Sequence, residues 1–174
     1  KAPREIKGAA LSCILSDTLE FRSPTTTQQD RDIAASIAEE LGVDMASYAA
    51  DMFAAKSDVS AFSETELLRM DSKEFDLNGT GLRVSVLETT APAPLLARKD
   101  ALMAAMPGVA AEDGAAEVLL FIVDILKEEA TLLVPNDAVK SIAEKSFGTS
   151  VEGDHVVLPG IMSRKKQIIP NLTM

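Results

Sequence analysis

The sequence predicts an α/β protein in which a helical segment precedes a small α/β domain with a mixed sheet of about five strands. Three observations indicate this class. The first 56 residues carry apolar residues at helical spacings, whereas later segments alternate apolar and polar residues with the period of a strand. The apolar run 118–123 is typical of a buried strand. The chain has 174 residues, of which 47% are hydrophobic, so it can form a real core.

The first predicted helix runs from Arg4 towards Asp17. Ile6, Ala10 and Cys13 recur at spacings of four and three residues, which indicates one apolar face. The only cysteine, Cys13, is interpreted as a small buried apolar residue of this face and not as half of a disulfide. This interpretation favours a reducing, cytoplasmic compartment.

Two further helices are predicted from their capping residues. Thr26 or Thr27 can cap a helix that ends at Gly42, and Asp44 can cap the next one. Each helix of this segment has a single apolar face, and that face must be buried against another part of a protein. We therefore interpret residues 1–56 as the helical tail of a larger domain.

A second domain is predicted after the small polar stretch of residues 56–60, and we interpret residues 57–62 as the linker and hinge. A capping box at Ser63 and Glu66 starts a short helix there, so the domain is assigned to residues 63–174. The later elements are a β-hairpin of residues 73–77 and 82–88, a helix from Pro92 through Met106, strands 117–124 and 131–134, a helix 136–147 and a strand 155–158.

The overall charge limits the classes of partner. A net charge of −10 and a pI near 4.6 repel polyanions, so neither nucleic acid nor an anionic membrane is expected as a partner. The longest apolar run is closed by Asp124, far short of the roughly 20 residues that span a bilayer. Any anion must therefore be bound locally.

A basic cluster, Arg164-Lys165-Lys166, interrupts this acidic chain. Three adjacent cations repel one another, so the arrangement is easier to explain if an anion such as phosphate binds among them. Gly160 lets the backbone turn before the cluster, and the hydroxyl of Ser163 can donate to the anion. The alternative is a solvated edge strand whose lysines prevent aggregation.

Asp17 is a candidate metal ligand. It lies eleven positions after Ile6, which at about 100° per residue returns it to the same apolar face, near the end of the helix. Burial and the helix dipole both disfavour a carboxylate there, and a metal ion would resolve both costs. The alternative is that the helix has already ended and Asp17 caps a turn with Ser16 and Thr18.

Lys73 is a further candidate. It shares a strand face with Phe75 and Leu77. Its charge is therefore either carried to solvent along a snorkelling stem or directed into a site between the domains.

Four groups of residues resemble one known family, in its order and at close to its spacing. They are Ile14–Leu19 with Phe21–Thr25, Asp71–Phe75, Asp124–Leu126, and Ser163–Gln167 with Pro170, Leu172 and Thr173. On these motifs the chain resembles the manganese-dependent, family II inorganic pyrophosphatases of the DHH phosphoesterase superfamily. The resemblance spans nearly the whole chain.

The resemblance implies a role for each candidate residue. Asp17 is similar to an aspartate that ligates a metal pair, and Lys73, Arg164 and Lys165 are similar to the cations that hold substrate phosphate. It implies manganese as the cofactor, with cobalt or magnesium as alternatives, and most ligands outside this chain. The implied substrate is pyrophosphate or a short polyphosphate, and a homodimer of the full-length parent is left open.

The resemblance also implies that the chain contains parts of two domains with different roles. Residues 1–56 would finish an N-terminal DHH domain, and residues 63–174 would form the smaller C-terminal DHHA2 domain. In the family these domains close over pyrophosphate and a metal-bridging water attacks phosphorus, which combines an activated nucleophile with stabilisation of charge. Residues 57–62 would act as the hinge.

This sequence departs from the family in one respect. The Asp-His-His motif and the other metal ligands of the family do not occur in it. One carboxylate cannot hold a metal pair, so this chain alone is expected to be inactive. Two other interpretations stay open: an exopolyphosphatase of the same superfamily, and a non-catalytic module that binds phosphate or a partner.

Overall fold

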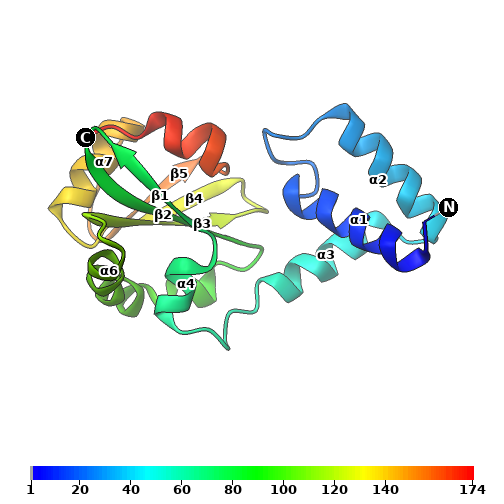
Figure 1. Cartoon of the computed structure of the whole chain (residues 1–174), viewed down its shortest axis with the longest axis horizontal. Helices are drawn as coiled ribbons and strands as arrows, with labels where there is room; N and C mark the ends of the chain where they lie inside the picture. Colours follow the sequence, from blue (N-terminus) through cyan, green and yellow to red (C-terminus); the bar gives the residue numbers. More distant parts are fainter. Residues whose placement is uncertain (1) are drawn as a thin grey trace. The chain divides into compact units, whose positions relative to one another are not determined.

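The computed structural model describes residues 2–174 and divides the chain into two compact units (Figure 1). The first unit ends at Ser57 and consists of helices. The second unit comprises Asp58–Met174 and contains all five strands. Within residues 2–174, no helix is both long and apolar enough to cross a membrane.

Three helices form the first unit, at the predicted positions. They are α1 (Arg4–Asp17), α2 (Gln28–Leu41) and α3 (Met45–Lys56). Thr27 and Asp30 form a capping box at the start of α2, and Gly42 ends it with a left-handed φ of 65°. The carboxylate of Asp44 accepts the Ser47 N–H at the start of α3. The sequence signals for these helix ends are thus confirmed.

The buried face of α1 is not the predicted one. Leu11 and Leu15 are fully buried where α1 packs on the other two helices, whereas Ile6 is 58% exposed and Cys13 is exposed. The prediction that Cys13 is buried is therefore wrong. This helix has two apolar faces, one with Leu11 and Leu15 and the other with Ala10 and Cys13. The leucine face is buried because leucine removes more apolar surface from water per residue than alanine or cysteine does.

A five-stranded mixed sheet forms the centre of the second unit. Its strands are β1 (Ser72–Leu77), β2 (Thr80–Thr89), β3 (Glu117–Asp124), β4 (Glu129–Leu133) and β5 (His155–Pro159), paired in the order β1-β2-β3-β4-β5. Strands β2 and β3 are parallel, and every other pair is antiparallel. The predicted α/β class with a mixed sheet of five strands is confirmed.

The helices of the second unit include two short helical turns that were not predicted, and one predicted helix is divided. They are α4 (Glu64–Met70), α5 (Ala93–Leu96), α6 (Lys99–Asp113), α7 (Asp137–Phe147) and two short turns, η1 (Arg164–Ile168) and η2 (Ile169–Asn171). The single helix expected to end at Met106 is instead two helices, and the second continues past Pro107. Proline removes one backbone hydrogen bond, but Val109 and Ala110 are buried beyond it, and this packing keeps the last turns helical.

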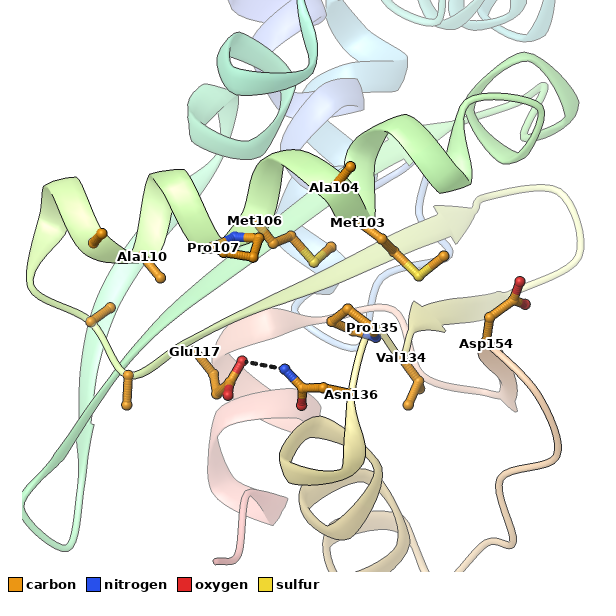
Figure 2. A pocket seen from close by; sticks show the side chains of 13 residues that line it. Met103, Ala104, Met106, Pro107, Ala110, Glu117, Val134, Pro135, Asn136 and Asp154 are labelled. Carbon is orange, nitrogen blue, oxygen red and sulfur yellow. Dashed lines mark hydrogen bonds between the residues drawn. The ribbon is translucent and has the colours of Figure 1, made fainter.

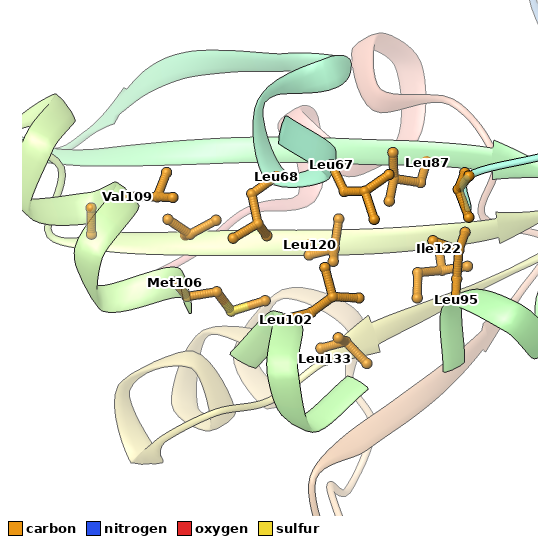
Figure 3. Close-up of a cluster of buried hydrophobic side chains, with 13 residues drawn as sticks. Leu67, Leu68, Leu87, Leu95, Leu102, Met106, Val109, Leu120, Ile122 and Leu133 are labelled. Atoms are coloured by element: carbon orange, nitrogen blue, oxygen red, sulfur yellow. The ribbon is translucent and has the colours of Figure 1, made fainter. Parts of the chain in front are cut away.

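The core explains why β3 carries an unbroken apolar run. Leu120 and Ile122 belong to a cluster beneath α4 and α6, shown in Figure 3. Phe121 points to the other face because side chains alternate along a strand, and its ring meets Phe147 of α7 edge-on at 6.0 Å. Helices therefore cover both faces of the sheet at this strand (Figure 1).

Candidate functional site

The basic cluster lies in η1, a wide helical turn that follows β5. The backbone N–H of Ile168 donates to the carbonyl of Ser163 at 3.0 Å, and the hydroxyl of Ser163 accepts the Lys166 N–H at 3.3 Å. The edge strand considered as the alternative is therefore wrong. In a helical turn consecutive side chains fan around the axis, so Arg164 and Lys166 do not share a face as they would in a strand.

The side chain of Gln167 shapes the segment that leads into this turn. Its carbonyl oxygen accepts the backbone N–H groups of Met162 at 3.0 Å and Ser163 at 2.9 Å. Its amide nitrogen donates to the carbonyl of Gly160 at 2.6 Å, and Gly160 itself adopts a left-handed φ of 75°. Three hydrogen bonds from one side chain thus fix residues 160–163, the segment immediately before Arg164.

The guanidinium of Arg164 is fixed to the start of β1. One terminal nitrogen, Nη1, donates to the backbone carbonyl of Asp71 at 2.8 Å, and the other, Nη2, lies 2.8 Å from Oδ1 of the Asp71 carboxylate. The Arg164 side chain is only 16% exposed, whereas that of Asp71 is 54% exposed. The fold therefore places the basic cluster beside the edge strand that carries Lys73.

Lys73 and Lys165 extend this positive region. Lys73 lies two residues after Asp71 in β1, and Lys165 follows Arg164 in η1. Both lysines are exposed. Within residues 2–174 neither ammonium group has a hydrogen bond or ion pair, so their charges are available to an anion.

Asp17 lies in the first unit and does not have the environment that was predicted. It is the last residue of α1, and its side chain is exposed. The expectation of a buried carboxylate is wrong because it relied on the face of Ile6, which is not the buried face. Among residues 2–174 no group of three or more His, Cys, Asp or Glu side chains could hold a metal ion. The described residues therefore do not fit a manganese site by themselves.

The segment after Asp17 has an unusual backbone. Leu19, Glu20 and Phe21 have consecutive left-handed φ values of 50°, 52° and 68°. Each such conformation costs roughly 1–2 kcal/mol for a residue with a side chain. Leu19 is nevertheless buried, and the Glu20 N–H donates to the carbonyl of Leu15 at 2.9 Å. Backbone strain of this kind clusters at functional sites, which keeps Asp17 a candidate.

A cavity of about 690 Å³ lies away from these cations, between α6 and the connection from β4 to α7 (Figure 2). Its lining is mostly apolar and includes Met103, Met106 and Pro135. The ionisable groups in the lining are the carboxylates of Glu117 and Asp154. Carboxylates repel phosphate, so this cavity is not the anion site.

Sequence reasoning missed two residues of the candidate site. Asp71 and Gln167 lie in motifs that resemble the family, but the sequence assigns no role to either residue. The sequence shows that Asp71 is a carboxylate close to Lys73. It does not show that Asp71 pairs with Arg164, because the two residues are 93 positions apart. The contacts of Gln167 are local, and a turn containing Gly160 offered a weak indication of them.

Comparison with known proteins gives consistent results. The profile of the DHHA2 domain matches residues 50–174. A protein of Lactobacillus johnsonii, named a probable manganese-dependent inorganic pyrophosphatase, is 39% identical over 98% of this chain and 55% of its own length. A Deinococcus radiodurans protein with the same name is 46% identical over 93% of this chain and 53% of its own length.

Among the solved structures that match, the following one shares the fold across almost the whole chain. It is described as a candidate family II inorganic pyrophosphatase of Methanococcus jannaschii, and it aligns with a TM-score of 0.85 at 34% identity. The alignment covers 98% of this chain and 55% of that chain. The chain thus spans about half the length of the relatives it matches.

Proposed function

The chain belongs to the DHHA2 domain family, and on this premise we propose that it forms the phosphate-binding portion of a manganese-dependent inorganic pyrophosphatase. Such an enzyme converts diphosphate and water into two phosphates. The observation that carries the proposal is the fixed guanidinium of Arg164 beside the strand that bears Lys73. Relatives that align along nearly the whole chain and are named for this activity support it.

Three cations of the second unit would bind the substrate. The guanidinium of Arg164 is planar and offers paired N–H donors, which suit two oxygens of one phosphate. Lys73 and Lys165 are exposed point charges that can neutralise further oxygens. Cations placed in this way stabilise the charge that spreads over the phosphoryl oxygens during transfer, and this stabilisation is the main protein contribution to such reactions.

We also propose that the complete enzyme requires manganese. Relatives are named as manganese-dependent, and Asp17 is the residue of this chain that would contribute one ligand. Because the described residues do not fit a manganese site alone, we expect no metal-dependent hydrolysis of pyrophosphate by this chain by itself. Turnover by the purified chain above a blank containing only metal would contradict this expectation.

The two units would have separate roles. We assign residues 1–56 to the end of a DHH domain, residues 63–174 to the substrate-binding domain, and residues 57–62 to the connection and hinge. The division of the structure after Ser57 supports a boundary at this position, although residues 58–62 fall in the second unit, where Val59 belongs to the hydrophobic core. All three proposed phosphate ligands then lie in one domain.

Calorimetric titration with pyrophosphate tests the proposed site. The loss of a charge-assisted hydrogen bond in Arg164→Ala should weaken binding about ten-fold or more. Lys73→Ala and Lys165→Ala should weaken it less, because exposed point charges are worth less. Lys145→Ala, an exposed lysine of α7, is a matched control and should leave affinity unchanged. Equal affinities for Arg164→Ala and Lys145→Ala would contradict the proposal.

A further inference from the structure

We propose that Asp71 is an internal counter-ion that occupies the anion position of Arg164 in the free protein and sets the affinity with which a phosphate replaces it. The inference rests on the proposed function, since it concerns the same guanidinium. It assigns an affinity-determining role to a residue outside the three proposed ligands. The ligand class is a phosphate dianion, either free or as one end of a diphosphate.

Asp71 offers Arg164 two different acceptors. The backbone carbonyl receives Nη1 and the carboxylate receives Nη2, each at 2.8 Å. Both terminal nitrogens are thus directed at one residue. A phosphate that accepts from Nη2 at the position now held by the Asp71 carboxylate must replace that carboxylate, because two anionic oxygens cannot occupy one position and like charges repel.

The carbonyl of Asp71 is the permanent part of this arrangement. It also accepts the backbone N–H of Val86 in β2, at 2.9 Å. This hydrogen bond holds the carbonyl in place directly before the pairing of β1 with β2, which begins at Ser72. Arg164 keeps this anchor whether or not an anion is bound.

The carboxylate of Asp71 is the exchangeable part. The Asp71 side chain is 54% exposed, so water can solvate the carboxylate when it leaves. An ion pair with one exposed partner contributes little, and a stronger anion can compete with it. A phosphate dianion carries twice the charge of the carboxylate and is also attracted by Lys73 and Lys165 nearby. A monoanion such as acetate has no such advantage.

The Asp71 carboxylate therefore limits which anions can bind Arg164. In the free protein the Asp71 carboxylate neutralises Arg164, and only a multiply charged phosphate replaces it. Removing the carboxylate charge while keeping the backbone should make anion binding tighter, which is the opposite of what removing a ligand does. This difference in sign separates Asp71 from the three proposed ligand cations.

The test is a calorimetric titration of the 174-residue chain with pyrophosphate in the absence of divalent metal. Asp71→Asn keeps the shape and the backbone carbonyl, and we expect about two- to five-fold tighter binding, the factor that corresponds to an exposed ion pair. Asp76→Asn is the matched control, because Asp76 is an exposed aspartate of β1, the strand that Asp71 precedes, and its contact is to the Gly79 N–H. The control should bind as the wild type does.

The outcomes distinguish this inference from the proposed function. Binding by the wild type that is lost in Arg164→Ala, with Asp71→Asn no tighter than Asp76→Asn, would overturn the role of Asp71 and leave the phosphate site standing. Weaker binding by Asp71→Asn would also overturn it. Asp71→Ser provides a second neutral variant, and it should tighten binding in the same direction. An absence of binding in every variant would overturn the proposed function and this inference together.

Discussion

Arg164 is held by two acceptors of one residue, and the sequence could not identify that residue. The basic cluster predicted an anion site because adjacent cations repel, which is a local argument. Its partner Asp71 lies 93 positions earlier, so only folding brings the two together. The assignment of phosphate binding to Lys73, Arg164 and Lys165 stays a prediction, now with a defined geometry for one of the three.

Gln167 is expected to position Arg164 by holding the preceding segment. Gln167→Ala leaves the N–H groups of Met162 and Ser163 without their acceptor, so the free energy of unfolding should fall by about 1–2 kcal/mol. Pyrophosphate binding should weaken several-fold at a temperature where the variant is fully folded. Denaturant unfolding and calorimetry measure the two effects.

A second glutamine provides the control for this prediction. Gln29 is exposed on α2 and its side chain has no hydrogen bond within the described residues, so Gln29→Ala should change neither quantity. If Gln167→Ala loses stability but binds pyrophosphate normally, its role is structural only. If the free energy of unfolding of Gln167→Ala equals that of Gln29→Ala, the three hydrogen bonds of Gln167 do not contribute to stability.

Individual elements were predicted best where a local signal marks their ends. The capping boxes of α2 and α4 and the left-handed Gly42 were all visible as residue types at fixed offsets. The exceptions are elements decided by packing. The last turns of α6 continue past Pro107, and the leucine face of α1 displaces the predicted face. Local propensity does not include these contacts.

One contact between elements gives a dependence of stability on pH. Asp154, just before β5, pairs with the ammonium of Lys99 at the start of α6 and lies 2.7 Å from Nδ1 of His155. These hydrogen bonds lower the pKa of the Asp154 carboxyl from 3.8 to about 2. A lowered pKa in the folded state adds stability that is fully present above pH 3.8 and is lost as the pH falls towards 2.

Asp154→Asn removes this titration. The variant should be less stable than the wild type at pH 5, and the difference should shrink as the pH falls towards 2. Denaturant unfolding at a series of pH values measures it. A stability difference that stays constant between pH 5 and pH 2 would show that the Asp154 carboxylate does not carry this effect.

The whole molecule consists of two units, and the proposed phosphate site lies within one of them. Asp71, Lys73, Arg164 and Lys165 all belong to Asp58–Met174, which has its own sheet and core. A protein of residues 58–174 alone should therefore unfold cooperatively and bind pyrophosphate within about a factor of two of the full chain. Calorimetry on both proteins, each with an Arg164→Ala partner, tests this. Loss of binding in the shorter protein would assign part of the site to the first unit.

The sequence by itself determined the α/β class, the order of the strands and main helices, and which residues form the basic cluster, because these depend on residue type and short spacings. Membership of the DHHA2 family followed from motifs that are also local. Only the tertiary structure decided which face of α1 is buried, that Asp17 is exposed, and that Asp71 holds Arg164. The physical reason is that burial and ion pairing depend on contacts between distant segments, and periodicity within one segment cannot specify those contacts.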